Sequence, residues 1–230
     1  MDFGIIISNL GLYFSGLWTT IWLVVTALVL GLLLAVPLGV MRTSPNPLIN
    51  GPVWAYTYFF RGTPLFIQMS MIYFGMAQFE AVKASIFWPL LKEAWFCAVL
   101  AFTLNTAAYT AEIVRGTILA TPRGEIEAAK ACGMSPGLML RRVLLPSAFR
   151  RALPAYGNEV IFMLHGSAVA SLVTIADLTG VARLINSRFY APYEAYLTVA
   201  AFYAALTFLI VWVFRRLEHR WHAHLRPRAG

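Results

Sequence analysis

Ionisable residues inside apolar sequence are the groups in this chain best suited to chemistry. Glu159 and His165 lie in one long apolar run, Asp177 follows its end, and Glu112 lies near the end of an earlier run. Ionisable groups are costly inside a membrane and usually mark the path of an ion or a substrate. We therefore take Glu159, His165 and Asp177, together with the neighbouring Ser167, as candidates for a polar path through lipid.

Each of these residues also has a structural interpretation, which the sequence leaves open. Glu112 and Glu159 can pair with nearby arginines such as Arg115 or with helix ends, and His165 can be a hydrogen-bonded packing residue. Asp177 can gate an outer opening or cap a short helix that follows it. Residues 159 and 165 are six apart, which places them on different faces of a helix. One narrow polar stripe therefore cannot include both.

Motifs for covalent or metal chemistry are missing from the sequence. No G-x-x-x-x-G-K-[ST] loop is present, so we expect ATP to bind elsewhere. Cys97 lies in an apolar run and Cys132 in a polar segment, so neither a disulfide nor a metal spacing is expected. His219, His222 and His224 suit a basic tail near anionic lipid better than a metal site. We expect no catalytic residue, metal or cofactor in this chain.

A polar, helix-forming segment interrupts the apolar sequence. Residues 125–130 favour a helix, and Gly133 suits its C-terminal cap. Ser135 and Pro136 suit the N-cap and first position of a second helix, whose extension Pro146 discourages. The sequence predicts two short helices at an angle. This hairpin either only links two spans or contacts a partner outside the membrane.

The elements that position these residues are expected to be membrane-spanning helices. The chain is 60% hydrophobic and 12% charged, whereas soluble domains have about 25% charged residues. Its apolar residues form long blocks, which indicates one all-α integral membrane domain over residues 1–230. The N-terminal run is too long for a signal-peptide core and is expected to stay in the membrane. We expect five spans, at residues 12–41, 64–79, 94–113, 152–176 and 195–214.

The segment before the second span is harder to assign. Residues 53–60 are apolar and are expected to form an interfacial or re-angled helix. Turn-forming residues are expected to break the chain just before it; these are Pro45, Pro47, Gly51 and Pro52. A sixth crossing is therefore not favoured.

The positions of lysine and arginine orient the five spans. Four lie on the side of the N-terminus, namely Lys83, Lys92, Arg183 and Arg188. Fourteen lie on the other side, namely Arg42, Arg61, Arg115, Arg123, Lys130, Arg141, Arg142, Arg150, Arg151, Arg215, Arg216, Arg220, Arg226 and Arg228. Cytoplasmic loops are enriched in these residues. The N-terminus is therefore expected outside, with the hairpin and C-terminus in the cytoplasm. Because the basic residues flank apolar runs, the net charge of +8 does not indicate nucleic-acid binding.

The hairpin resembles the EAA loop of ATP-binding-cassette (ABC) importer permeases. The family pattern is EAA, three residues, Gly, nine residues and I-x-L-P, and Val143 here stands in the place of the isoleucine. In that family the loop docks into a groove on a cytoplasmic ATPase and carries its motion to the spans. The resemblance assigns this role to Glu127, Ala128, Ala129, Gly133, Leu145 and Pro146, within a coupling loop at residues 115–150.

Other segments resemble one branch of that family. Residues 61–68 match the RGTPL-x-x-Q signature of polar amino acid permeases, and residues 105–113 and 155–161 are also similar. Thr63 can cap the second span and Pro64 can begin it, while Arg61 suits the cytoplasmic interface as an anchor. Residues 164–167, Leu-His-Gly-Ser, are similar to the M-type subunit of histidine, lysine-arginine-ornithine and opine importers.

The resemblance implies the type I importer permease fold in a bacterial inner membrane and a polar, basic amino acid as substrate. The implied partners are two ATPase subunits that bind ATP and Mg, a second Q-type permease subunit and an external solute-binding protein. We expect Glu159 and His165 to contribute to the path of a basic amino acid. Two alternatives remain: a secondary transporter or channel acting alone, which predicts an internal repeat, and a scaffold that recruits partners through the hairpin.

Overall fold

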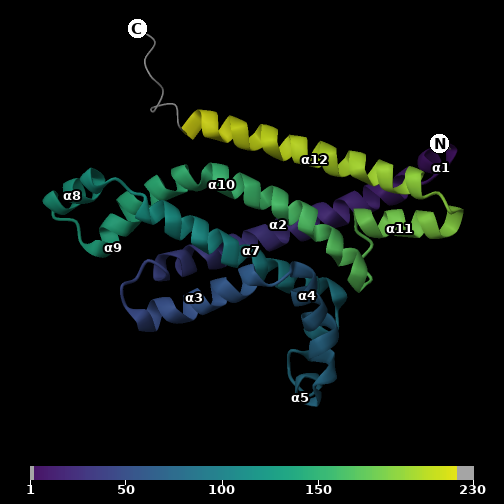
Figure 1. Cartoon of the computed structure of the whole chain (residues 1–230), viewed down its shortest axis with the longest axis horizontal. Coiled ribbons are helices and arrows are strands. Elements are labelled where there is room, and N and C mark those ends of the chain that lie inside the picture. Colours follow the sequence, from purple (N-terminus) through teal and green to yellow (C-terminus); the bar gives the residue numbers. More distant parts are fainter. Residues whose placement is uncertain (1–2, 222–230) are drawn as a thin grey trace, which may run out of the picture.

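The computed structural model describes residues 3–221, which form helices and no strand. Four long helices make up the frame (Figure 1): α2 (Leu10–Met41), α7 (Ala94–Leu119), α10 (Leu145–Gly166) and α12 (Pro192–Trp221). Shorter α-helices join them: α1 (Phe3–Ser8), α3 (Pro47–Gly62), α4 (Leu65–Ser70), α5 (Glu80–Lys83), α6 (Trp88–Leu91), α8 (Arg123–Ala131), α9 (Pro136–Met139) and α11 (Leu178–Phe189). The tighter or wider helical turns are η1 (π, Met71–Gly75), η2 (3₁₀, Met76–Gln78), η3 (π, Leu140–Leu144) and η4 (3₁₀, Ser167–Val173).

Helix α7 is the centre of the bundle. It packs against α2, α3, α4 and α10, while α12 lies along the outside against α10 and α11 (Figure 1). In the most apolar 18-residue window of α7, 72% of the residues are buried, compared with 6% in α12. Side chains on α7 are therefore held on several sides, whereas most of α12 is left to contact lipid or another chain.

Small residues bring α2 and α7 close together. Ala27, Gly31 and Ala35 of α2 are buried, as are Thr106 and Ala107 of α7. A Cβ atom added to Gly31 would collide with Cγ2 of Thr106. In lipid, helices associate mainly through such close packing, because lipid tails are as apolar as the helix surface. The α2–α7 contact thus fixes the position of Thr106.

Three helices in residues 3–221 are long and apolar enough to cross a membrane. They are α2, α7 and α12, which contain the predicted spans at residues 12–41, 94–113 and 195–214. A fourth span is possible if the helical segment at residues 136–173 and α11, whose axes differ by 48°, together form one bent span. The predicted run at residues 64–79 forms α4, η1 and η2, which are short and irregular. The fifth crossing therefore remains a prediction.

The expected break before residue 53 is confirmed only around Pro45, in the non-helical residues 42–46 between α2 and α3, and is wrong for Pro47, Gly51 and Pro52. Helix α3 begins at Pro47, where Asn46 caps it by accepting a hydrogen bond from the Leu48 N–H (3.0 Å), and it continues through Gly51 and Pro52. An internal proline removes one backbone hydrogen bond. The helix persists because its buried face, at Val53 and Thr57, packs on the bundle.

Candidate functional site

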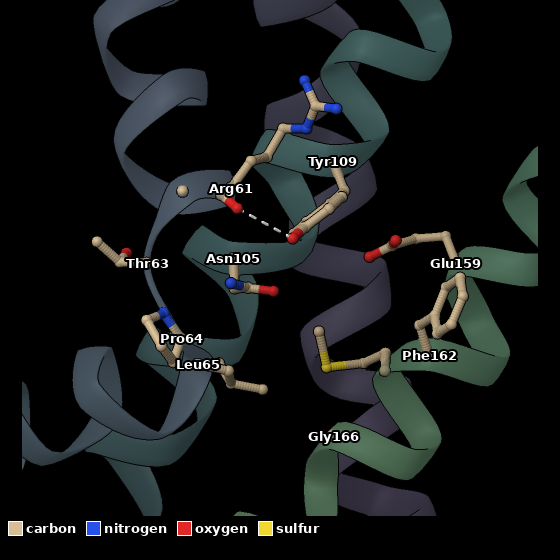
Figure 2. A pocket seen from close by; sticks show the side chains of 11 residues that line it. Arg61, Thr63, Pro64, Leu65, Asn105, Tyr109, Glu159, Phe162 and Gly166 are labelled. Carbon is tan, nitrogen blue, oxygen red and sulfur yellow. Dashed lines mark hydrogen bonds between the residues drawn. The ribbon is translucent and has the colours of Figure 1, made fainter.

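A cavity of about 540 Å³ opens between the α3–α4 junction, α7 and α10 (Figure 2). It combines charged, polar and apolar side chains from three parts of the chain. Its lining residues are Arg61, Gly62, Thr63, Pro64, Leu65, Asn105, Tyr109, Glu159, Phe162, Met163 and Gly166. Ligand pockets for small molecules commonly have this size and this mixture of groups.

The junction between α3 and α4 is held in place by two amides. The buried Gln68 Nε2 donates to the carbonyls of Phe60 (2.8 Å) and Thr63 (2.9 Å). Asn105 Nδ2 of α7 donates to Gln68 Oε1 (3.0 Å), which joins the junction to the central helix. These bonds satisfy carbonyls that the end of α3 leaves open. Gln68 therefore fixes the backbone that carries Arg61.

The predicted cap at the start of the second span is not formed. Helix α4 begins at Leu65, and Pro64 occupies the N-cap position. The Thr63 hydroxyl donates to the Phe59 carbonyl (2.9 Å) and accepts from Gln68 Nε2 (2.7 Å). The prediction that Thr63 caps a helix beginning at Pro64 is wrong, because the side chain of Gln68 takes the hydroxyl oxygen that a cap would use.

Arg61, at the C-terminal end of α3, lines the cavity. Its guanidinium carbon lies 5.4 Å from the centroid of the Tyr109 ring, and the Tyr109 hydroxyl donates to the Arg61 carbonyl (3.3 Å; Figure 2). Among residues 3–221, no carboxylate lies within ion-pair distance of this guanidinium. The sequence indicated only an interfacial anchor at Arg61. Its position on a cavity shared with Glu159 depends on how α3, α7 and α10 pack, which the sequence does not show.

Glu159 approaches the same cavity from α10. It is 6% exposed and accepts a hydrogen bond from Thr106 Oγ1 on α7 (2.8 Å). Within the described part of the chain, no arginine or lysine lies within 4.0 Å of its carboxylate, so the expected pairing with a nearby arginine is not observed. Burial of a carboxylate without a cation is costly. The arrangement therefore favours binding of an external cation.

The other three predicted pathway residues do not line this cavity. His165 Nε2 lies 3.1 Å from Thr207 Oγ1 of α12, which supports the packing interpretation. The buried Ser167 hydroxyl bonds a carbonyl of its own helical turn. Asp177 caps α11 by accepting from the Gly180 N–H (2.8 Å), as the capping alternative predicted. Of the four candidates, the structure brings only Glu159 to the cavity.

Glu112 belongs to a separate ion cluster. Its carboxylate lies 2.9 Å from Nε of Arg42, the C-cap residue of α2, and 3.3 Å from Arg115 Nη1, and it accepts from the Thr57 hydroxyl of α3 (3.2 Å). The expected pairing with Arg115 is confirmed. The cluster connects the end of α2 with α3 and α7, so it stabilises the bundle.

The polar hairpin has the predicted caps. The N–H groups of Gly133 and Met134 bond the carbonyls of Lys130 (2.9 Å) and Ala129 (3.1 Å), which is a Schellman ending of α8. Gly133 has a φ of +71°, which glycine adopts at little cost. Ser135 caps α9 by accepting a hydrogen bond from the N–H of Leu138, the third residue of that helix (3.4 Å). Figure 1 shows α8 and α9 together at one end of the bundle.

The residues of the EAA pattern are divided between surface and interior. Glu127, Ala128 and Gly133 are exposed, and Ala129 is buried.

The prediction that Pro146 discourages extension of the second helix is wrong, since α9, η3 and α10 follow one another without a gap. Proline is tolerated there because it falls in the first turn of α10, directly after the wide η3 turn.

A polar cluster attaches the hairpin to the bundle. Glu125 of α8 accepts from the Ser147 hydroxyl (2.9 Å), which accepts from Arg151 Nη1 of α10 (2.6 Å). Arg151 Nη2 donates to the carbonyl of Thr117 (3.1 Å) and the hydroxyl of Thr121 (2.7 Å) at the end of α7. Arg151 therefore joins α7 and α10 and, through Ser147, α8.

Comparisons with known proteins agree with these features. Over 219 residues the chain is 47% identical to the histidine/lysine/arginine/ornithine transport system permease protein HisM of Salmonella typhimurium, covering 95% of this chain and 93% of HisM. It is 41% identical over 231 residues to the nopaline transport system permease protein NocM of Agrobacterium fabrum, covering 100% and 96%.

Solved structures show the same fold. The crystal structure of an amino acid ABC transporter with histidines matches with a TM-score of 0.85 and 34% identity, covering 96% of this chain and 99% of that one. The inward-facing MetNI methionine ABC transporter matches with a TM-score of 0.78 at 24% identity, covering 93% and 98%, which bears on the fold alone. The fold is that of type I ABC importer permeases.

A family model for the inner membrane component of binding-protein-dependent transport systems matches residues 27–223. This range includes the cavity, the hairpin, α7, α10 and α12, together with the part of α2 from residue 27 onward. The chain therefore belongs to that family, as a membrane-embedded permease subunit of an ABC importer and not an enzyme.

Proposed function

We propose that this chain is the M-type permease subunit of an importer for basic amino acids, such as histidine, arginine, lysine, ornithine or opines. The names of relatives that are 41–47% identical support this substrate class. The observation that carries the proposal is the buried carboxylate of Glu159, which faces a cavity of about 540 Å³ and forms no ion pair with any lysine or arginine among residues 3–221. A cationic substrate supplies the missing charge.

The proposed complex contains a Q-type permease subunit, two cytoplasmic ATPase subunits and an external solute-binding protein. The ATPases hold ATP and Mg. The fourteen-to-four distribution of basic residues supports five crossings, with the N-terminus outside and the hairpin and C-terminus in the cytoplasm of a bacterium. His222 and His224 of the basic tail lie outside the described residues.

Coupling to ATP is proposed to run through the hairpin residues Glu127, Ala128, Ala129, Gly133, Leu145 and Pro146. The exposed, small Ala128 allows a partner to approach α8 closely, and Glu127 beside it offers a charge. When the ATPases close on ATP they push α8 and α9. The continuous path α9–η3–α10 carries that push to Glu159, and the cavity changes its access from the cytoplasm to the outside.

Substitution of Glu159 tests the substrate role. In proteoliposomes containing the complete importer, Glu159→Gln is expected to reduce the apparent affinity for arginine about 10- to 100-fold, because a charge-assisted hydrogen bond is lost. Glu80→Gln is the matched control, since Glu80 is exposed in α5 and does not line the cavity. Arginine uptake that is equally strong in both variants would contradict the assignment.

Co-purification tests the coupling role. Glu127→Lys reverses the charge beside Ala128 and is expected to weaken retention of the ATPase subunits on the tagged permease. Glu80→Lys makes the same exchange elsewhere and should leave retention unchanged. Full retention and full ATP-driven uptake with Glu127→Lys would remove the hairpin from the proposed coupling path.

A further inference from the structure

Two opposite charges line the same cavity without pairing to each other. Arg61 approaches it from the end of α3 and Glu159 from α10 (Figure 2). No ion pair of either group is found within residues 3–221. Glu159 is 6% exposed, whereas Arg61 is exposed at the rim of the cavity, so its guanidinium is accessible to a ligand. An unpaired cation and an unpaired anion on one cavity are complementary to a ligand that carries both signs.

Tyr109 contacts both ends of Arg61, its guanidinium and its backbone carbonyl. The guanidinium lies over the Tyr109 ring, 5.4 Å from the centroid, and the carbonyl accepts from the hydroxyl of the same tyrosine. The preceding carbonyl, that of Phe60, accepts from both Gln68 (2.8 Å) and Asn105 (3.3 Å). The arginine is therefore pre-organised before any ligand arrives, which lowers the entropic cost of binding.

The opposite wall is fixed in a comparable way. Glu159 accepts from Thr106 Oγ1, and Thr106 is 1% exposed between α2 and α7. The apolar side chains of Leu65, Phe162 and Met163 complete the cavity lining. The cavity thus offers a cation, an anion and an apolar wall suited to a short methylene chain.

We propose that Arg61, supported by Tyr109, binds the α-carboxylate of the amino acid whose cationic group is held by Glu159. This inference rests on the proposed function and adds a second point of recognition to it. Arginine forms two parallel hydrogen bonds with a carboxylate, a geometry that lysine does not reproduce. The cavity therefore selects amino acids over the corresponding decarboxylated amines, independently of any external binding protein.

The test compares arginine with agmatine, which is arginine without its carboxylate. Equilibrium binding of each radiolabelled ligand is measured on the purified, detergent-solubilised importer without the solute-binding protein. The wild-type importer is expected to bind arginine at least 10-fold more tightly than agmatine. Arg61→Gln is expected to lower the affinity for arginine about 10- to 100-fold and to leave agmatine binding unchanged or stronger, because a repelling cation is removed. Arg61→Lys should lose less.

The two ligands separate the two proposals. Glu159→Gln should weaken both ligands, because both carry the guanidinium. If Arg61→Gln weakens arginine and agmatine equally, the carboxylate role of Arg61 is refuted while Glu159 is unaffected. Loss of both ligands in Arg61→Gln and also in Arg61→Lys assigns Arg61 to the fold and likewise overturns the inference. If the wild-type importer binds both ligands equally, the carboxylate is not recognised. If Glu159→Gln binds arginine normally, the proposed function itself fails.

Discussion

The contact between Gly31 and Thr106 predicts that Gly31→Ala lowers stability and that a second substitution, Thr106→Ser, restores it. A Cβ at position 31 would lie closer than 3.0 Å to Thr106 Cγ2, a separation that Cβ atoms in proteins essentially never show. Gly31→Ala must therefore displace α7 or rotate Thr106, whose hydroxyl bonds Glu159. Overpacking of this kind costs about 1–3 kcal/mol, which corresponds to a decrease in Tm of about 2–12 °C for a chain of this size.

The colliding atom is a single methyl group, so its removal should restore the fold. After that methyl group, the nearest atoms to the new Cβ are the Thr103 oxygen at 3.4 Å and the Ala107 nitrogen at 3.5 Å, which are ordinary contacts. Thr106→Ser deletes the methyl group and keeps the hydroxyl. The double variant Gly31→Ala/Thr106→Ser should regain most of the lost Tm and of the arginine uptake.

The assay is thermal unfolding of the solubilised importer, followed by tryptophan fluorescence, alongside uptake in proteoliposomes. Gly11→Ala is the control in the same helix, because its Cβ would have no atom within 4 Å; it should leave Tm unchanged or raise it slightly. A neutral Gly31→Ala would show that α2 and α7 are not packed as described. A destabilised Gly31→Ala that Thr106→Ser fails to rescue would show that the methyl group is not the cause.

Three further predictions concern the polar contacts of the hairpin and the bundle. Arg151→Met removes the guanidinium that joins α7 to α10 and to Ser147. The ratio of amino acid imported to ATP hydrolysed should therefore fall several-fold. Arg150→Met is the control at the exposed neighbouring position and should leave that ratio unchanged. Gly133→Ala places a Cβ at a φ of +71° and should destabilise the hairpin by about 1 kcal/mol. Amide hydrogen exchange in α8 should then become faster. Unchanged exchange would show that alanine is not strained at this position. Glu112→Gln leaves two arginines without their carboxylate and should lower the free energy of unfolding by about 2–4 kcal/mol, as measured by thermal unfolding. Changing Arg42 to Gln as well should recover part of that loss. If the losses of the two single variants simply add in the double variant, the pairing is ruled out.

Features that depend on neighbouring residues in the chain were predictable from the sequence. Gly133 and Ser135 form the predicted caps of the hairpin, and Asp177 caps α11 as one of its two interpretations proposed. Residues 159 and 165 do point to different neighbours, as their spacing required. Each of these inferences uses only helix geometry and the capping chemistry of one side chain, which act over a few residues.

Features that depend on contacts between distant segments were not predictable. Arg61, Asn105 and Glu159 are separated by more than forty residues at each step, and only the packing of α3, α7 and α10 brings them to one cavity. The same cause explains the missed continuity of α3 through Pro52. A proline weakens a helix locally, and only the buried face of that helix decides whether the helix survives.

The uninterrupted path from α9 through η3 into α10 has a consequence for engineering. Glu159 lies fourteen residues beyond Leu145, or about 21 Å along a helix, without a loop between them. The surface proposed to contact the ATPases and the residue proposed to contact the substrate thus belong to one continuous helical path. Chimeric transporters that exchange the hairpin should therefore carry the whole of residues 136–166 from one parent, since a joint inside this path would change its rotation and turn Glu159 away from the cavity.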